Sequence, residues 1–222
     1  EEYEEFISKI NVNDFELFSI NENIIKDIKG HIGNLQVTVL DEDEDITLNV
    51  SQIVWFDAKQ PRKERIGIFD PNLSTIDEVI QTLKNNINSY SYKKFTTYDS
   101  SICQYHERRE EICSKCEEVC PTVAITKDDK TKTLTFSQID CHGCGGCISV
   151  CPSGAVDYAP SNKEALFEMS KFYKNTHPLV VPAKMNLENL EVSLKENILP
   201  FAIEGEKFLH EASFLTLLQM SG

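Results

Sequence analysis

The sequence predicts an α+β fold built around one cysteine-rich module. All eight cysteines lie between residues 103 and 151. On both sides of this stretch, amphipathic helical patterns alternate with β-branched extended patterns. No apolar run approaches the roughly 18 residues that a membrane helix needs, so no membrane insertion is expected. These observations predict three segments, namely an N-terminal α/β segment (1–95), the cysteine module (96–160) and a C-terminal α/β segment (161–222).

The charge of the chain excludes some partners. Its 222 residues include 22 Lys and Arg against 36 Asp and Glu, a net charge of −14. Such a chain repels nucleic acid and anionic lipid, and it has no basic patch with interleaved aromatic residues for phosphates. The first residues are acidic, unlike the start of a signal peptide. Clustered cysteines favour metal binding over disulfides, which predicts a cytoplasmic location where thiols stay reduced.

The N-terminal segment is expected to contain a hairpin and a helix. Residues 31–40 and 46–58 carry the alternating and β-branched residues of strands, and the acidic turn DEDED joins them. The stretch STIDEVIQTLKNNI, residues 74–87, has apolar residues at helical spacing. Ser74 or Thr75 is the expected N-cap of that helix.

The C-terminal segment alternates helix and strand. We expect helices over 163–174, 187–197 and 211–222, and extended chain over 177–183 and 198–205. This order is typical of a parallel α/β layer. Two strands make only part of such a layer, so we expect it to pair with the N-terminal region or to continue beyond residue 222.

The cysteine module contains a short internal repeat. CSKCEEVCPTVAI (113–125) and CGGCISVCPSGAV (144–156) share the pattern C-x2-C-x3-C-P-x2-A followed by an aliphatic residue. Cys141 extends the second copy to C-x2-C-x2-C-x3-C-P, the run found around [4Fe–4S] clusters. Three thiolates at intervals of three suit one loop around a cluster, and the fourth, followed by proline, turns away. Nearby glycines let the backbone approach the inorganic sulfurs. They are Gly143, Gly145 and Gly146.

The first copy lacks its upstream cysteine, because Glu110 stands where Cys141 stands in the second. Cys103 is the nearest replacement and would close the site from a longer loop, at little cost in closure entropy. Alternatively, Glu110 or Glu107 supplies an oxygen ligand, or the cluster lacks one iron. A third interpretation leaves this site empty, with Cys103 simply buried. Eight cysteines match two four-thiolate sites, and this count favours Cys103.

Zinc is the competing metal, since C-x2-C pairs also occur in zinc ribbons. Zinc ribbons use two such pairs and do not need a third cysteine at the same spacing or a fourth before proline. The full run from Cys141 to Pro152 therefore favours an iron–sulfur cluster.

Residues 100–160 resemble the bacterial two-[4Fe–4S] ferredoxin family. The resemblance implies a dicluster βαβ–βαβ module with two [4Fe–4S] clusters. It further implies that cluster one takes Cys103, Cys113, Cys116 and Cys151, and that cluster two takes Cys120, Cys141, Cys144 and Cys147. Outside the module, KGHIGNLQVTVL resembles a segment of heterodisulfide-reductase-type flavoprotein subunits. The flanking α/β pattern resembles ferredoxin-like subunits of anaerobic redox complexes, including those associated with formate dehydrogenases.

These features predict electron transfer through two clusters. The chain would act as a ferredoxin-like carrier or as an electron-transfer subunit of a larger anaerobic oxidoreductase, with redox proteins or other subunits as partners. No nucleophile–base constellation is visible, so the chain is not expected to be catalytic alone. The alternative function is a structural or redox-sensing iron–sulfur interaction domain.

Overall fold

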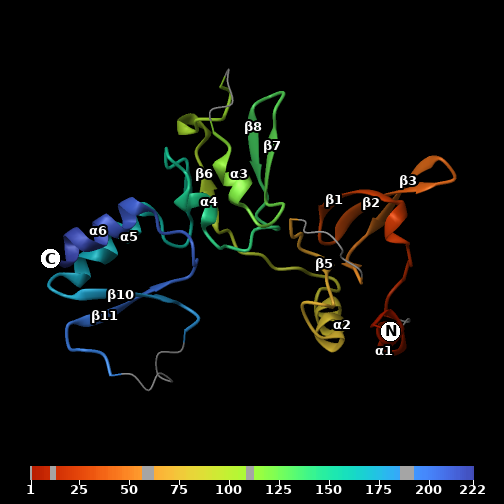
Figure 1. Cartoon of the computed structure of the whole chain (residues 1–222), viewed down its shortest axis with the longest axis horizontal. Coiled ribbons are helices and arrows are strands. Elements are labelled where there is room, and N and C mark those ends of the chain that lie inside the picture. The colour runs from red at the N-terminus through yellow and green to blue at the C-terminus, as the bar shows by residue number, and fades with distance from the viewer. Residues whose placement is uncertain (1, 11–13, 57–62, 109–112, 186–192) are drawn as a thin grey trace. The chain divides into compact units, whose positions relative to one another are not determined.

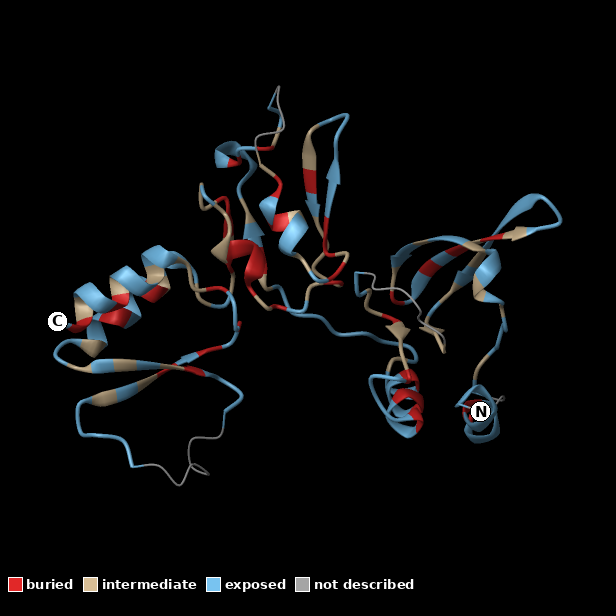
Figure 2. Ribbon diagram, in the orientation of Figure 1, coloured by how far each residue is buried: buried red, intermediate tan, exposed pale blue. Residues whose placement is uncertain are grey.

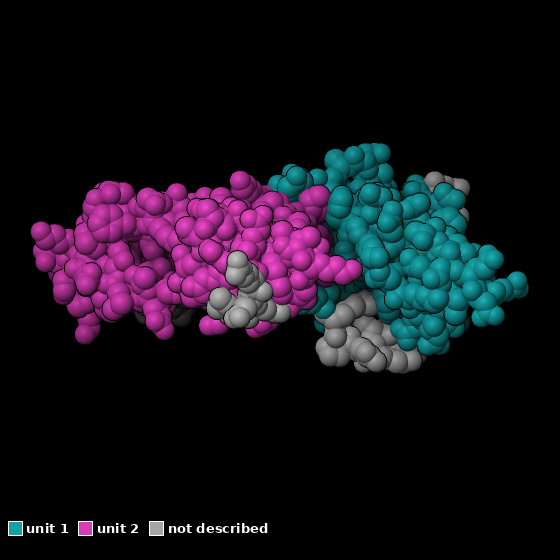
Figure 3. Space-filling view, turned by 90° about the horizontal axis from the view of Figure 1, so that it is seen from above, with its two compact units in different colours: residues 1–92 teal, residues 93–222 magenta. Residues whose placement is uncertain are grey.

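The computed structural model (Figure 1) describes residues 2–10, 14–56, 63–108, 113–185 and 193–222. Helices and strands are mixed along the chain, as the predicted α+β class requires. The chain divides into two compact units, residues 1–92 and 93–222, coloured separately in Figure 3. The predicted cysteine module and the C-terminal segment both lie in the second unit.

The first unit contains a three-stranded antiparallel sheet in the order β1-β2-β3. β2 (Asn34–Asp41) and β3 (Glu44–Val50) form the predicted hairpin. Glu42 and Asp43, at its turn, have φ values of 43° and 72°, which tight hairpins require. β1 (Ile25–His31) pairs with β2, although its charged sequence did not predict a strand. Alternate residues of β2 are buried, as expected for a strand with one covered face: Leu35, Val37 and Val39.

Two helices form a second cluster in this unit, α1 (Glu2–Lys9) and α2 (Ile76–Asn85). The predicted helix is confirmed, and its N-cap is Thr75. The Thr75 side chain accepts a hydrogen bond from the Glu78 amide, and the Glu78 carboxylate accepts one from the Thr75 amide. Figure 2 shows the buried residues along one side of α2. The remaining short elements of the unit are η1 (Glu22–Ile24), β4 (Ile53–Val54) and β5 (Ile68–Phe69).

The second unit begins with the cysteine-rich region. Its elements follow in the order β6 (Thr96–Tyr98), η2 (Ser100–Ile102), α3 (Lys115–Val119), β7 (Ile125–Asp128), β8 (Thr133–Phe136), α4 (Gly146–Ser149) and β9 (Val156–Tyr158). β7 and β8 pair antiparallel and form a hairpin between the two cysteine runs. β6 pairs antiparallel with β9, which brings the two ends of the region together.

The C-terminal part contains α5 (Lys163–Ser170), η3 (Lys171–Tyr173), β10 (His177–Pro182), β11 (Ile198–Ile203) and α6 (Glu211–Ser221). β10 and β11 pair in parallel, as the alternating pattern predicted.

The helix expected over 187–197 is described only in part. Residues 187–192 lie outside the described part of the chain, and residues 193–197 contain no helix. All five of these residues are exposed.

One hydrophobic core joins the cysteine-rich region to the C-terminal part. Tyr158 and Phe201 are each 1% exposed and belong to the same cluster of buried side chains as Cys147. Figure 2 shows many of these buried residues around α4. Within the described residues, no helix has the length and apolar character needed to cross a membrane.

Candidate functional site

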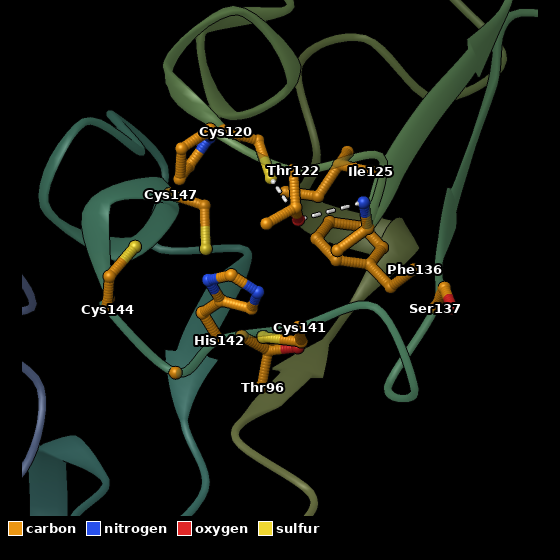
Figure 4. Close-up of a pocket in the computed structure, with 14 residues that line it drawn as sticks. Thr96, Cys120, Thr122, Ile125, Phe136, Ser137, Cys141, His142, Cys144 and Cys147 are labelled. Carbon is orange, nitrogen blue, oxygen red and sulfur yellow. Dashed lines mark hydrogen bonds between the residues drawn. The ribbon is translucent and has the colours of Figure 1, made fainter. Parts of the chain in front are cut away.

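Four cysteines line one pocket in the second unit, shown in Figure 4. Cys120 follows α3 directly, and its backbone is extended before Pro121. The other three come from the loop that leads into α4 and from α4 itself: Cys141, Cys144 and Cys147. This set corresponds to the ligands that the ferredoxin resemblance implied for cluster two.

The other four cysteines line a second pocket. Cys103 directly follows η2, Cys116 lies in α3, and Cys151 follows α4. Cys113, two residues before α3, completes the set. This set corresponds to the ligands implied for cluster one, and it includes the displaced Cys103.

The two cysteine runs therefore cross. Cys120 belongs to the first run but lines the pocket of the second, and Cys151 belongs to the second run but lines the pocket of the first. The local reason is that α3 and α4 are short and pack on each other, so the chain leaves each helix on the side of the other run's loop.

The thiols of each set act on one another electrostatically, and Cys116 also acts on Cys147 of the other set. Burial raises the pKa of Cys116 to about 12, helped by the charges of Cys151, Cys103 and Cys113. Burial also raises the pKa of Cys147, followed in order by the charges of Cys141, Cys120, Cys116 and Cys144. Gathered thiolates without a cation repel one another, whereas iron ions would hold them ionised together.

The donor sets fit iron–sulfur clusters. A [4Fe–4S] cluster takes four cysteine thiolates, one on each iron, and each pocket supplies four. Among the described residues, no three metal-ligating side chains converge on the position of a single ion. In the second pocket, the amide of Tyr105 already donates to Cys103 Sγ at 3.4 Å, a type of bond that tunes such clusters.

Two glycines shape the loop of the first-described pocket. Gly143 has a φ of 71°, and a Cβ there would lie 2.5 Å from the ring of Phe95. Gly145 has a φ of 81°, and a Cβ there would lie 2.3 Å from Cβ of Phe208. Both positions combine the left-handed backbone with close packing, so other residues would strain the loop.

Glu110 and Glu107 are the two alternative oxygen ligands for the first cysteine run. Glu110 lies outside the described residues. The side chain of Glu107 is 79% exposed, and its Oε1 lies 3.9 Å from Nε2 of His106. Cys103, in contrast, is only 7% exposed.

Two tyrosines beside the pockets were not predicted from the sequence. Tyr98 lines the pocket of Cys103, and its pKa is raised first by burial and then by the neighbouring thiol of Cys103. Tyr158 donates to the carbonyl of Gly143 at 3.3 Å. Burial, then the charges of Glu204, Cys141 and Cys144, raise its pKa to about 12. The tyrosines lie at the ends of β6 and β9, and only the pairing of these distant strands brings them to the site.

Comparisons with known proteins find similarities to ferredoxins. The family model for the 4Fe–4S dicluster domain matches residues 111–155. A polyferredoxin, MvhB, of Methanothermus fervidus is 32% identical over 65 residues, which are 26% of this chain and 16% of that protein. The polyferredoxin-like subunit of an aliphatic sulfonate oxidoreductase of Pyrococcus furiosus is 38% identical over 48 residues, 22% of this chain and 27% of that subunit. The chain thus spans only a minor part of these two relatives.

A third relative is covered almost completely. An uncharacterized ferredoxin of Methanocaldococcus jannaschii is 34% identical over 64 residues, which are 29% of this chain and 94% of that protein. No solved structure is significantly similar to the chain. With its eight cysteines in two groups of four, the chain belongs to the dicluster ferredoxin family and binds two [4Fe–4S] clusters.

Proposed function

We propose that this chain relays electrons between redox protein partners through its two clusters. Cluster one is held by Cys103, Cys113, Cys116 and Cys151, and cluster two by Cys120, Cys141, Cys144 and Cys147. The observation that carries the proposal is the crossing of Cys120 and Cys151, because each cysteine run then contributes to both sites and the sites adjoin. Adjoining clusters suit electron transfer from one to the other.

The module that holds the clusters extends over residues 96–160. Its order of elements, β6-α3-β7 followed by β8-α4-β9, supports a βαβ–βαβ ferredoxin module, as do the pairs β6/β9 and β7/β8. Residues 1–95 and 161–222 are then flanking α/β segments. Because clusters of this type need reduced thiols, we place the protein in the cytoplasm.

The clusters supply the one-electron chemistry, and the side chains and backbone of this protein set their surroundings. Cys116 and Cys147 hold thiolates in buried positions, at 8% and 9% exposure. The amide of Tyr105 donates to Cys103, which stabilises negative charge on that sulfur. Burial and N–H donors act in opposite directions on the reduction potential, and their balance sets it for each site.

The names of the relatives support a place within a larger assembly. One is a polyferredoxin and another is a polyferredoxin-like subunit of an oxidoreductase. We propose that this chain likewise works as an electron-transfer subunit or carrier, and that any catalytic site lies on a partner.

Iron analysis tests the two sites. Anaerobically purified protein should contain about eight iron and eight sulfide per chain, as two [4Fe–4S] clusters require. Cys103→Ser should reduce both to about four. Glu107→Gln is the matched control from the same loop and should keep about eight. Full content in Cys103→Ser together with a loss in Glu107→Gln would transfer the ligand role to the carboxylate.

A redox titration tests electron transfer itself. Dithionite should reduce both clusters of the purified protein, and reoxidation should restore the visible spectrum without loss of iron. Clusters that resist reduction, or that lose iron in one cycle, would contradict the relay and favour a structural role.

A further inference from the structure

The C-terminal part of the second unit places a short strap over the loop of cluster two. The strap is residues 204–208, between β11 and α6. Within it, the amide of Lys207 donates to the carbonyl of Cys144 at 2.8 Å. This bond joins the strap directly to the backbone of a cysteine that lines the cluster-two pocket.

The strap and the loop fit each other through glycines on both sides. A Cβ on Gly145 of the loop would lie 2.3 Å from Cβ and 2.6 Å from Cα of Phe208. A Cβ on Gly205 of the strap would lie 2.8 Å from the carbonyl oxygen of Gly143. Neither contact leaves room for a side chain, so strap and loop are packed backbone to backbone at two points.

Stacked aromatic rings seal the same place. Phe208 is 5% exposed, and its ring stacks on Tyr158 with centroids 4.7 Å apart and planes 12° apart. Phe95 stacks on Tyr158 more loosely, at 6.4 Å and 24°. Since Phe95 also contacts Gly143 and Phe208 contacts Gly145, the rings cover the cysteine loop at these two glycines.

We propose that the strap shields cluster two from solvent and keeps its reduction potential below the value of a hydrated cluster. Reduction adds negative charge, which a dry apolar surrounding disfavours, and solvent exposure is one of the factors that set the potential of these clusters. Gly205 and Phe208 are therefore positioning residues, and they make the two clusters unequal. This inference rests on the proposed assignment of cluster two to Cys120, Cys141, Cys144 and Cys147.

Phe208→Ala removes the aromatic part of the strap. Phe214→Ala is the matched control, because Phe214 lies in the following helix α6 and is 47% exposed. We would follow iron release to a chelator in air and titrate both clusters by electron paramagnetic resonance. In Phe208→Ala, half of the iron should be released several-fold faster, and one of two midpoint potentials should rise. Phe214→Ala should match the wild type in both measurements.

Two results would contradict the proposal that the strap shields cluster two. One is a Phe208→Ala protein with wild-type iron release and potentials. The other is faster release of all the iron in a single phase, with both potentials shifted alike. To assign the affected half, the substitution is repeated in Cys103→Ser, where only cluster two is expected. There, the remaining iron should show the faster release, and a wild-type rate would contradict the proposal.

A measurement on the unmodified protein covers the case in which Phe208→Ala does not fold. By hydrogen exchange, the amide of Lys207 should exchange as slowly as those of β6 and β9. Exchange at the rate of an unstructured peptide would contradict the proposed role of the strap. A wild-type protein without iron would instead contradict the proposed function. Two reducible clusters together with an unprotected Lys207 amide would contradict only the proposed role of the strap.

Discussion

Cys116 and Cys147 occupy matching positions in the two cysteine runs, yet they line different pockets. Both are buried, and the charge of Cys116 is among the causes that raise the pKa of Cys147. Cys116 lies in α3 and Cys147 in α4, and these helices pack on each other. The two four-cysteine sites thus meet across one helix contact, which gives electrons a short route between them.

The crossing of the cysteine runs makes a sharp prediction. Cys120→Ser should remove the same cluster as Cys141→Ser, and Cys151→Ser should remove the same cluster as Cys113→Ser, because these pairs share pockets. Paramagnetic resonance of the reduced proteins would compare the cluster that remains in each variant. Identical spectra for Cys120→Ser and Cys113→Ser would mean that each run holds its own cluster.

The iron–sulfur motif was predictable because its cysteine spacing is encoded locally. The spacing from Cys141 to Pro152 and its repeat at Cys113 are specific to one kind of cluster. The hairpin of β2 and β3 and the cap at Thr75 were likewise visible as turn and capping residues. Such features depend on residues that are close together in the chain, so they can be predicted from the sequence.

Other features depend on distant partners. The hydrogen bond between Lys207 and Cys144 joins only backbone atoms, so no side-chain pattern predicts it. β1 carries charges and is a strand because it lies beside β2.

Gly143→Ala should weaken cluster two. The substitution places a Cβ 2.5 Å from the ring of Phe95 at a φ of 71°, and the loop must shift to relieve both. We expect faster loss of about four of the eight iron atoms, measured by chelator release. Gly33→Ala is the control, since Gly33 has a φ of 83° but no neighbour within 4 Å of a Cβ. Equal effects on iron release would show that packing against Phe95 plays no part.

The capping box of α2 predicts a local effect on stability. Thr75→Ala removes the side chain that accepts from the Glu78 amide and should cost about 1 kcal/mol of unfolding free energy. Ser74→Ala, next to it, is the control, because Thr75 is the N-cap. Urea denaturation followed at Trp55, in the same unit, measures both variants. A loss of equal size in Ser74→Ala would contradict the capping role of Thr75.

The same box has a pH dependence with a definite sign. The backbone amide and then the hydroxyl of Thr75 lower the pKa of Glu78 from its ordinary 4.5. Folding therefore favours the carboxylate, so its contribution is complete above pH 4.5 and disappears as the pH falls through the lowered pKa. The difference in stability between wild type and Glu78→Gln should shrink across that range. A difference that stays constant down to pH 2 would show that the charge of Glu78 is not involved.

Phe201 tests whether the C-terminal part and the cysteine-rich region unfold together. Phe201 is 1% exposed, meets Tyr173 edge to face at 5.3 Å, and lies in the same core as Cys147 and Tyr158. Phe201→Ala should cost about 3–5 kcal/mol. Because one core serves both parts, bleaching of the cluster absorbance and loss of helical ellipticity should move to lower temperature together. If only the ellipticity moves, residues 161–222 fold independently of the clusters, and the strap then depends on a separable domain.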